Sequence, residues 1–451
     1  MDVPTLPDAI VAPVDAFVRD LVTWAAQHRD ADLSSLEQAV REGLRALAPQ
    51  LVGGLITVTQ RSLDPSMQRD RPRCPACGTL GRLRGWRARQ MKTTCGSVHW
   101  ERPWAQCPGC RASWSPTDQT LEVQAQQRIS ASLQEWLVTL GTLLPFAVAR
   151  EQLAMLTGVT VGAETTRTIT EAAGTTLDGR LREEAARVER TRAPVGPVEP
   201  APDLLVAETD GVMVRFLDAW HEVKVGVVGG WDPTRPEKQR HLTAQSFVAA
   251  RAPVTDWAGR WGAEVARRGG LEEVDYAGNG IRPGLATLRR VLVLGDGARW
   301  IWRAAADQFG ERIEIVDWFH AAEHIWTVAR AVYGEGTTGA STWADASITV
   351  LYDEGAEGLL ERLRELQPST AAARKVVATE RGYFRANRER MRYPELRAQG
   401  LPIGSGAVES SAKHVIQQRM KRSGCRWSDG GGQALAVLCA QHATQRAQAA
   451  A

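Results

Sequence analysis

The sequence lacks any apolar run that approaches the roughly 18 consecutive residues of a membrane-spanning helix. Its first four residues, MDVP, have neither the basic start nor the apolar stretch of a signal peptide. Cysteine is scarce, because seven in a chain of 451 residues do not make a disulfide scaffold, and a reducing compartment argues against bridges. We therefore expect a cytoplasmic protein without disulfides.

The chain also has little net charge, +3 at neutral pH, but this charge is unevenly spread. Between Arg69 and Arg111 there are ten lysines or arginines against two acids, Asp70 and Glu101, a local excess of +8. Charge concentrated in this way indicates a polyanionic partner for one part of the chain. The composition, 43% hydrophobic and 24% charged, excludes wholesale disorder.

The length predicts about three domains. The spacing of apolar residues also changes along the chain, which agrees with several domains. Helical spacing of apolar residues runs to about residue 63 and again from 130 to 192. Four prolines within residues 193–202 then interrupt any helix and mark a linker. Beyond them, short apolar runs predict the order strand, strand, strand, helix, strand, helix, strand, which is typical of a ribonuclease-H-like (RNase H-like) sheet. Residues 321–399 return to a charged helical pattern.

Four of the seven cysteines stand in two tight pairs, CPAC at 74–77 and CPGC at 107–110. A tight turn brings both thiolates of a C-x2-C pair onto one tetrahedral ion, and two such turns complete a zinc site. The 29 residues between the pairs exceed the usual spacing but suit a hairpin. We predict that Zn²⁺ binds Cys74, Cys77, Cys107 and Cys110. The simpler interpretation, four unrelated buried thiols, does not explain the pairing.

Four arginines are interleaved with Trp86 inside this ribbon, namely Arg82, Arg84, Arg87 and Arg89. On a regular strand the first two would point to one face and the last two to the other. A bulge at Gly85 would shift this alternation and bring all four into one row of phosphate contacts. A solvated surface is the simpler interpretation, but a DNA-binding module next in the chain favours nucleic acid.

A helix over 149–156, a turn at Gly158 and a helix over 163–173 have the order of a helix-turn-helix. The second helix offers polar side chains for the edges of a DNA groove: Glu164, Thr165, Arg167 and Thr168. Two short helices around a glycine are common in helical bundles, so this pattern is weak alone. Beside the basic ribbon it predicts a DNA-binding region with Thr165 and Arg167 among its contacts.

Three acids stand where a catalytic metal site would need them. Asp210 ends the first expected strand, Asp296 ends the fourth between two glycines, and Glu409 lies one turn into the last helix. The first and fourth strands of an RNase H-like sheet are neighbours, so the two aspartates would lie side by side. Three clustered carboxylates repel one another unless cations bind, and Mg²⁺ or Mn²⁺ prefers such oxygen ligands. We predict that these acids bind two such ions for in-line displacement at phosphorus.

The simpler interpretation of each acid is local, since aspartate before glycine is ordinary turn chemistry. Asp317, after the fifth strand, is either a further metal ligand or the N-cap of the next helix, and with His320 it is expected to support the site. A basic stretch on and after the Glu409 helix is expected to hold DNA phosphates. It consists of Lys413, Arg419, Lys421, Arg422 and Arg426. Lys413 has an alternative, an i,i+4 ion pair with Glu409.

We therefore expect a multidomain α/β protein, with an RNase H-like catalytic core that carries a helical insertion and follows a zinc ribbon and a helix-turn-helix domain. The expected segments are an N-terminal helical segment (1–68), the zinc ribbon (69–125), the helix-turn-helix region (126–192), the proline-rich linker (193–203), the first part of the core (204–320), the helical insertion (321–400) and the C-terminal helical region that completes the core (401–451).

Several motifs resemble those of bacterial insertion-sequence transposases of the Kra family. They are ETDGV at 208–212, GDGARWIW at 295–302, VDWFH at 316–320, GSGAVES at 404–410 and RMKRSGCRW at 419–427. The resemblance covers most of the chain, from the ribbon to about residue 440. It implies a DDE transposase with an RNase H-like core, in which Asp210, Asp296 and Glu409 match the acidic triad.

The residues and the resemblance together predict a transposase that binds double-stranded DNA at its element's ends, cleaves strands and joins the freed 3′-hydroxyls to target DNA. Because two ends are processed together, we expect a homodimer or larger assembly on DNA, associated with the bacterial nucleoid. A structure-selective nuclease or resolvase would use the same acids without strand transfer. A zinc-ribbon and helix-turn-helix regulator would need only the first half of the chain. A purely structural zinc protein is disfavoured by the basic charge of the ribbon.

Overall fold

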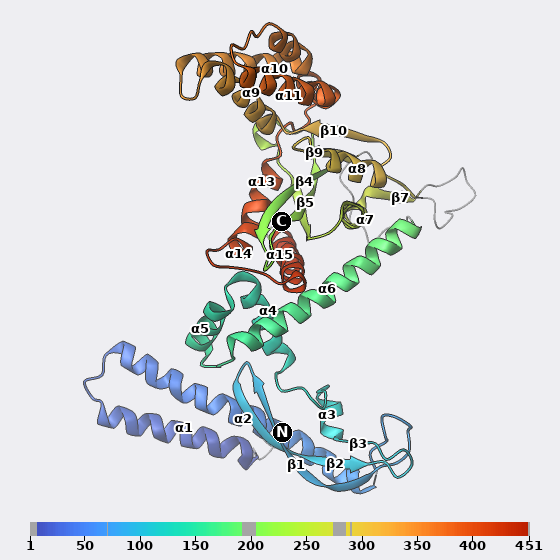
Figure 1. The fold of residues 1–451 in the computed structure, drawn as a ribbon. Helices are drawn as coiled ribbons and strands as arrows, with labels where there is room; N and C mark the ends of the chain where they lie inside the picture. Colours follow the sequence, from blue (N-terminus) through green and yellow to red (C-terminus); the bar gives the residue numbers. More distant parts are fainter. Residues whose placement is uncertain (1–6, 70, 192–203, 274–285, 289–290, 450–451) are drawn as a thin grey trace. The chain divides into compact units, whose positions relative to one another are not determined.

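The computed structural model describes residues 7–69, 71–191, 204–273, 286–288 and 291–449. The proline-rich linker expected over 193–203 lies outside the described residues. Contacts divide the chain into two compact units, Met1–Thr170 and Glu171–Ala451, and Figure 1 labels their elements. Among the described helices, none combines the length and the apolar character needed to cross a membrane.

The first unit contains a helical hairpin, a β-hairpin and a group of shorter helices. Its elements are α1 (Asp8–Gln27), α2 (Leu33–Arg69), β1 (Arg82–Thr93), β2 (Gly96–Gln106), β3 (Ser113–Trp114), α3 (Pro116–Thr120), α4 (Ala131–Leu143), α5 (Phe146–Thr157) and the start of α6 (Ala163–Thr191). Helix α2 packs on β2, where Val52 and Ile56 cover the buried side chains of Met91, Val98 and Trp100. The expected N-terminal helices and ribbon hairpin therefore share one core.

Helices α4, α5 and the first turns of α6 occupy the region expected to form the helix-turn-helix. Ser130 is the N-cap of α4, because its side chain accepts a hydrogen bond from the Leu133 amide. Gly158 ends α5 in the left-handed conformation, with φ of 76°, which costs a glycine little. The buried side chains between these helices are Leu133, Leu137, Leu153, Val159 and Val161.

The helix expected over 163–173 is longer than predicted. As α6 it is continuous from Ala163 to Thr191. Gly174, directly after the expected end, lies against the backbone of helix α15 (Asp429–Ala449), where there is no room for a side chain. This glycine therefore serves close helix packing and does not end the helix.

The second unit is a mixed sheet with helices on both faces. Its strands are β4 (Leu204–Arg215), β5 (Trp220–Trp231), β6 (Thr243–Ala250), β9 (Val291–Gly295) and β10 (Arg312–Val316), beside a small hairpin of β7 (Leu271–Glu273) and β8 (Ala286–Leu288). Its helices and helical turns, after α6, are η1 (Glu237–Gln239), α7 (Val254–Val265), η2 (Ala266–Gly270), α8 (Arg299–Gln308), α9 (Trp318–Tyr333), α10 (Thr338–Arg364), α11 (Ala371–Asn387), η3 (Arg388–Arg390), α12 (Tyr393–Ala398), α13 (Gly406–Ser411), η4 (Ala412–Gln417), α14 (Gln418–Met420) and α15. All five expected strands are present.

The five long strands are ordered β10-β9-β4-β5-β6. The pairs β4–β5 and β5–β6 are antiparallel, whereas β4–β9 and β9–β10 are parallel. The first and fourth strands of this unit, β4 and β9, are therefore neighbours, as expected from the sequence. They run in the same direction, and the pairing ends at Glu208 and Leu294, so the carboxyl end of β9 lies beside the middle of β4.

Opposite faces of the central strands carry different helices. Gly226 of β5 lies against the ring of Trp261 in α7, and it is paired with Thr209 of β4. The preceding residue, Glu208, points to the other face. There its carboxylate accepts a hydrogen bond from the Val408 amide of α13. Helices α7 and α13 thus cover opposite faces of the sheet.

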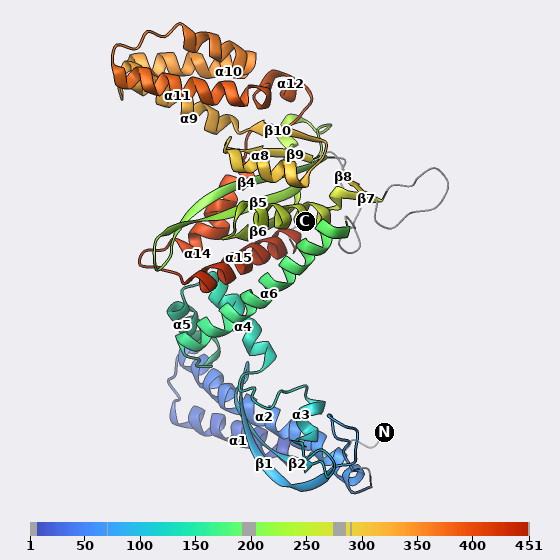
Figure 2. The same cartoon turned by 45° about the vertical axis from the view of Figure 1, so that its right-hand side comes forward.

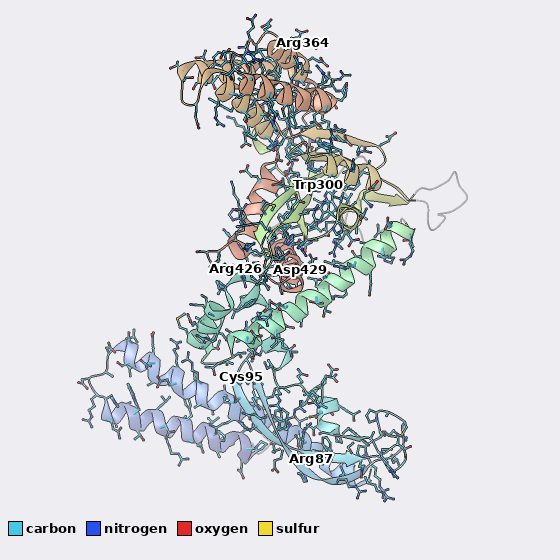
Figure 3. All side chains as sticks on the ribbon, in the orientation of Figure 1. Arg87, Cys95, Trp300, Arg364, Arg426 and Asp429 are labelled. Atoms are coloured by element: carbon cyan, nitrogen blue, oxygen red, sulfur yellow. The ribbon has the colours of Figure 1, made fainter. Side chains whose placement is uncertain are left out.

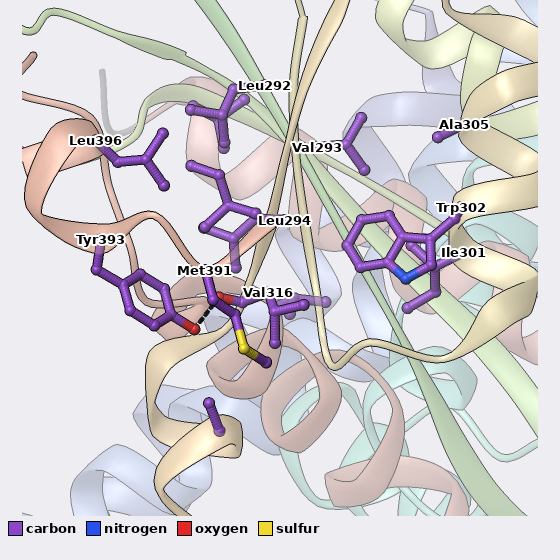
Figure 4. Packing of buried hydrophobic residues seen from close by; sticks show 14 of the residues in the cluster. Leu292, Val293, Leu294, Ile301, Trp302, Ala305, Val316, Met391, Tyr393 and Leu396 are labelled. Carbon is purple, nitrogen blue, oxygen red and sulfur yellow. Dashed lines mark hydrogen bonds between the residues drawn. The ribbon is translucent and has the colours of Figure 1, made fainter. Parts of the chain in front are cut away.

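Large apolar side chains fill the interior beside the parallel half of the sheet. Figure 4 shows Leu294 of β9 in this cluster with Ile301 and Trp302 of α8. Tyr393 of α12 belongs to the same cluster, and its hydroxyl donates a hydrogen bond to the Val316 carbonyl at 2.9 Å. This contact fastens the last helix of the expected insertion to β10.

Strand β6 lies at the antiparallel end of the sheet, and helix α15 covers its free edge. The amides of Phe247 and Arg251 donate to the side-chain oxygens of Thr444 at 2.9 Å and Gln433 at 2.7 Å. Figure 2 shows α15 running along β6. Side chains of a helix here accept hydrogen bonds that a further strand would otherwise accept.

Replacing Gly174 by alanine is expected to lower the free energy of unfolding of the second unit by about 1–3 kcal/mol, as overpacking does. A β-carbon there would lie 2.4 Å from the Ala434 carbonyl oxygen, so α6 and α15 would have to separate. Urea unfolding followed by circular dichroism measures the loss. Gly179→Ala in the same helix is the control, because its β-carbon would meet nothing within 4 Å. That variant should gain up to about 1 kcal/mol of helix propensity, and equal effects of the two changes would contradict the close packing.

Candidate functional site

Asp210 and Asp296 lie on neighbouring parallel strands. Glu208 of β4 is paired with Leu294 of β9, and each aspartate follows two residues later in the chain. Asp296 comes directly after the end of β9, whereas Asp210 does not end its strand as expected, because β4 continues to Arg215. Side chains two residues apart on a strand share a face, so Asp210 lies on the face of Glu208. Both aspartates are partly buried, and they are close enough to interact electrostatically.

The surroundings of Asp210 disfavour its negative charge. Burial raises the pKa of this carboxyl, and the charges of Asp296 and Glu222 raise it further. A hydrogen bond from the Gly211 amide, 2.6 Å from Oδ1, and the nearby His320 lower the pKa. Within the described residues no hydrogen bond engages the second carboxylate oxygen of Asp210. A cation at that oxygen would offset the repulsion between the acids.

Asp296 is held between a turn and a tyrosine. Its Oδ1 accepts a hydrogen bond from the Ala298 amide at 2.8 Å, and its carbonyl accepts one from the Tyr383 hydroxyl at 2.9 Å. Gly297 has a positive φ of 96°, and a β-carbon there would lie 2.9 Å from the Tyr383 ring. This glycine therefore makes room for a tyrosine of α11. Burial, with the charge of Asp296, raises the pKa of Tyr383, so its hydroxyl keeps the proton it donates.

Glu409 lies on α13, and the start of this helix is anchored on β4. The Val408 amide donates to Glu208 Oε2 at 2.7 Å, two residues before Asp210 along the strand. The Glu409 side chain is 64% exposed and accepts a hydrogen bond from Lys413 at 2.7 Å. The i,i+4 ion pair that we weighed against a metal ligand is thus present. In the described part of the chain, the three acids do not form a group with ligand atoms all within 4.8 Å.

Glu208 supports the site, although the sequence pattern did not reveal it. Its side chain is almost fully buried, and desolvation raises the pKa of its carboxyl to about 8 against the effect of the Val408 hydrogen bond. A carboxyl with this pKa is mostly protonated at neutral pH, so Glu208 adds little charge beside Asp210. Its position two residues before Asp210 was the signal that could have found it.

Asp317 supports the site through hydrogen bonds that both of its carboxylate oxygens accept. Oδ1 accepts from the amides of Phe319 at 2.6 Å and His320 at 3.0 Å, which makes Asp317 the N-cap of α9. Oδ2 accepts from the amide of Ser405 at 2.6 Å and from its hydroxyl. The N-cap that we considered is therefore present, and the second oxygen holds the loop that leads into α13.

The basic stretch around α14 is only partly available to a partner. Its exposed members are Lys413, Lys421, Arg422 and Arg426, the last of which is labelled in Figure 3. Arg419 is only 3% exposed, and its guanidinium lies over the Trp427 ring at 5.0 Å from the centroid. The expectation that Arg419 binds DNA is therefore wrong, because this side chain packs inside the unit.

The four paired cysteines form a compact group. Their sulfur atoms all lie within 4.8 Å of one another, and Cys77 Sγ is 3.5 Å from Cys107 Sγ and from Cys110 Sγ. Tetrahedral Zn²⁺ with bonds of about 2.3 Å requires sulfur separations of about 3.8 Å. The set therefore fits this ion with little rearrangement. Over the described ranges, it is the one group of three or more potential metal ligands brought so close.

Both cysteine pairs have the same backbone geometry. The amide of the first cysteine donates to the carbonyl five residues later, at 2.9 Å in one pair and 2.8 Å in the other. The residue after each pair is left-handed, Gly78 with φ of 73° and Arg111 with φ of 62°. The hydroxyl and amide of Thr79 lower the pKa of Cys77 to about 6, which favours the thiolate that binds zinc.

Strand β1 contains the expected bulge, but Arg89 does not lie in an exposed row with the other three ribbon arginines. Pairing with β2 shifts between Leu83 and Trp86, where Gly85 has φ of 110°. Arg89 is 7% exposed and donates to Asp118 at 3.1 Å and to three carbonyls in the segment 124–127. The expectation of a DNA contact is therefore wrong for Arg89, because Asp118 neutralises a buried guanidinium there.

The other three ribbon arginines are exposed. Arg82 and Arg84 flank the bulge, and Arg84 donates to the Gln106 side chain at 3.1 Å. Arg87, labelled in Figure 3, lies over the Trp104 ring at 4.2 Å from the centroid. A stacked guanidinium has fewer orientations to lose on binding and keeps its donors free for a phosphate.

The first turns of α6 expose part of the expected contact surface. Thr165 and Thr168 are exposed, whereas Thr166 and Thr170 are buried against α4. Arg167 is paired with Glu164, which accepts from its Nε at 3.0 Å. Thr165 therefore remains open to a partner, and Arg167 would have to leave an exposed ion pair to reach one.

Comparisons with known proteins give distant similarities. No family model matches the chain. A protein of Streptococcus gallolyticus described as "UPF0236 protein in vanSb 3'region" is 23% identical over 370 residues, which are 79% of this chain and 74% of that protein. A chain of the Drosophila P element transposase strand transfer complex is similar over 73% of this chain and 82% of its own length, with 9% identity and a TM-score of 0.23. That score is too low to support an inference about the fold, so the architecture is taken from the strand order of the chain itself.

Proposed function

We propose that this protein is a metal-dependent DNA transposase of the DDE type, with Asp210, Asp296 and Glu409 as its acidic triad. The observation that carries the proposal is the register of β4 and β9, in which each aspartate follows the pair Glu208 and Leu294 by two residues, so that the two acids lie on neighbouring strands. Asp210 is destabilised as an anion by burial and by Asp296. An acid in this environment is typical of a site that binds divalent cations.

The proposed catalytic domain is RNase H-like. Its support is a sheet in which three antiparallel strands are followed, along the chain, by two strands that run parallel to the first. Helices α9 to α12 lie between the fifth strand and α13 in the chain, where an insertion is proposed. The five motifs that resemble the Kra family fall on β4, at the end of β9, at the end of β10, at the start of α13, and on α14 with the residues after it.

Glu409 would join the aspartates by leaving its ion pair with Lys413. Exposed i,i+4 pairs are worth about 0.3–0.5 kcal/mol, far less than the attraction between a carboxylate and a divalent cation in a partly buried site. The backbone of α13 is already anchored through Val408, so the side chain of Glu409 is the part that would turn. Lys413 would then be free to hold a DNA phosphate.

The chemistry would be displacement at a phosphodiester. Mg²⁺ or Mn²⁺ held by the three carboxylates would polarise the attacking oxygen and stabilise the leaving one. The chain's own contribution is to orient these ligands. Glu208 and Asp317 hold the loop and helix that carry Glu409, and Tyr383 holds the backbone of Asp296.

The remaining basic features would bind DNA. Exposed ribbon arginines, Thr165 of α6 and the exposed part of the basic stretch offer donors for phosphates and base edges. Zn²⁺ would be structural, because four thiolates leave it no open position for a substrate. A homodimer or larger assembly would hold two element ends at once, on the nucleoid of a bacterial cytoplasm.

The test is a cleavage assay with the purified chain and double-stranded DNA that carries the ends of its own element. With Mg²⁺ we expect breaks at those ends and 3′-ends joined to target DNA, and EDTA should abolish both. Sequencing of the products separates the alternatives. Breaks without joined strands would indicate a nuclease or resolvase, and end binding without Mg²⁺-dependent breaks would indicate a regulator whose second unit is inert.

A further inference from the structure

We propose that the helical insertion completes the active site. Glu380 of α11, acting through His324, fixes the orientation of His320 in the first turn of α9. Tyr383, also of α11, fixes the backbone of Asp296. This inference rests on the proposed function, and it gives α9 and α11 a part in the reaction in addition to their packing.

Side chains of α9 and α11 form a hydrogen-bonded chain that ends at His320. Nδ1 of His324 lies 2.5 Å from Glu380 Oε2, and Nε2 of His324 lies 3.3 Å from Nε2 of His320. The two histidines are four residues apart, so they project from one face of α9, and Glu380 is 9% exposed. The amide of His320 donates to Asp317, whose own amide donates to the Gly295 carbonyl at 2.8 Å, directly before Asp296. This places the first turn of α9 beside the two aspartates, and His320 also interacts electrostatically with Asp210.

When both rings are neutral, these contacts determine which ring nitrogens carry protons. The carboxylate of Glu380 only accepts hydrogen bonds, so Nδ1 of His324 donates to it. In neutral His324 the other nitrogen is then an acceptor, and Nε2 of His320 must donate to it. Nδ1 of neutral His320 is left without a proton. The carboxylate of Glu323 lies 3.6 Å from this atom and is 78% exposed, which is too long for a hydrogen bond.

An acceptor nitrogen near Asp210 suits the nucleophile of the proposed reaction. Water and a DNA 3′-hydroxyl both present an O–H group, and Nδ1 of His320 would accept a hydrogen bond from it. This bond would turn the attacking oxygen toward the phosphorus. His324 and Glu380 do not touch the substrate in this arrangement. They act through His320 as positioning residues.

Tyr383 connects this chain to the second aspartate. Its ring stacks on His324 with centroids 3.8 Å apart, and its hydroxyl donates to the Asp296 carbonyl at 2.9 Å. One side chain of α11 thus contacts both the histidine chain and the turn after β9. A shift of α11 would therefore move His320 and Asp296 together.

Single-turnover cleavage of element-end DNA by the full chain tests the role of Glu380. Glu380→Ala and His320→Gln are each expected to lower the cleavage rate by about 10–100-fold, as loss of an outer hydrogen-bond partner does, with an unchanged Kd for DNA. Glu380→Gln keeps an acceptor for His324 and should recover most of the rate. Glu361→Gln in α10, an exposed side chain of the same helical insertion, is the matched control and should cleave as the wild type does.

A double variant separates positioning from a merely structural role. If Glu380 acts through His320, then Glu380→Ala in the His320→Gln background should cause no further loss. Losses that multiply would overturn the proposal, as would wild-type rates in both single variants. Thermal unfolding of each variant is measured alongside, and if Glu380→Ala does not fold, Glu380→Gln and the spectra below carry the test.

Long-range ¹H–¹⁵N spectra of histidine-labelled protein give a measurement that does not depend on cleavage. His320 is expected to carry its proton on Nε2, and Glu380→Gln should retain this tautomer. A proton on Nδ1 alone would overturn the proposal even in an active protein. Absence of wild-type cleavage would overturn the proposed function itself, whereas wild-type cleavage with unaffected variants would overturn only this inference.

Discussion

Replacing Asp296 by asparagine is expected to reduce Mg²⁺-dependent strand cleavage by on the order of a thousandfold. The amide keeps the size of the side chain and an oxygen for the Ala298 hydrogen bond, but it removes the charge beside Asp210. Metal stabilisation of such a displacement is worth several kcal/mol, and about 1.4 kcal/mol corresponds to a tenfold change in rate. Gel analysis of labelled element-end DNA measures the rate, and a binding assay on the same DNA should show end binding intact.

Asp307→Asn is the matched control for this change. Asp307 is an exposed residue of α8, so the variant loses the same charge outside the proposed site and should cleave as the wild type does. Cleavage by the Asp296 variant at the control's rate would remove Asp296 from the mechanism. Asp210→Asn is expected to behave like the Asp296 variant, because both acids would hold the same ions.

Loss of zinc is expected to unfold the cysteine end of the ribbon. Binding of structural zinc contributes about 10–16 kcal/mol in zinc-finger peptides near neutral pH. At the cysteine end of the ribbon only Ala105 and Trp114 are buried beside two of the cysteines, whereas the far end of the hairpin has a core of its own with α2, so the loss should be confined to the cysteine end. Cys107→Ser should therefore purify with almost no zinc and lose binding to element ends. The second unit has its own core and should remain folded. Elemental analysis, gel shifts and circular dichroism measure the three effects.

Cys95→Ser is the control for the zinc site. Cys95 is exposed and lies outside the four-cysteine group, so the variant should retain about one zinc ion per chain and normal DNA binding. A Cys107 variant that keeps both its zinc and its affinity for element ends would contradict the proposed ligand set.

The sheet could largely be predicted because each strand carries its own local signal. The runs at 204–207 and 291–294 are continuous and apolar, as strands buried on both faces are, and the latter forms most of β9. Strand β4 is longer than predicted and extends to Arg215. Its second half alternates buried and exposed residues and is a strand because it pairs with β5, which no local pattern specifies.

The arginines show where sequence reasoning fails. Spacing along β1 tells which of its side chains lie on the same face as Arg89. It does not tell that Asp118, 29 residues later, contacts Arg89 on that face. In the same way, the pattern of α14 does not predict the ring of Trp427 above Arg419. Whether a basic side chain meets solvent or a buried partner is decided by tertiary contacts.

The candidate site was predictable where it depends on strand ends and unpredictable where helices reach back to them. Asp210 and Asp296 follow from strand order alone. Tyr383 lies 87 residues after Asp296 and Glu380 lies 56 after His324, so no local pattern connects them. The i,i+4 spacing of His320 and His324 was the visible signal, since it places both rings on one face of a helix.

The cover over β6 has a consequence for the solution behaviour of shortened chains. Without Gln433 and Thr444, the amides of Arg251 and Phe247 would lose their acceptors, and the outer strand would present an open row of donors. Such a row recruits strands from neighbouring molecules and starts intermolecular sheet growth. By covering this edge, helix α15 therefore also prevents self-association of the protein through β6.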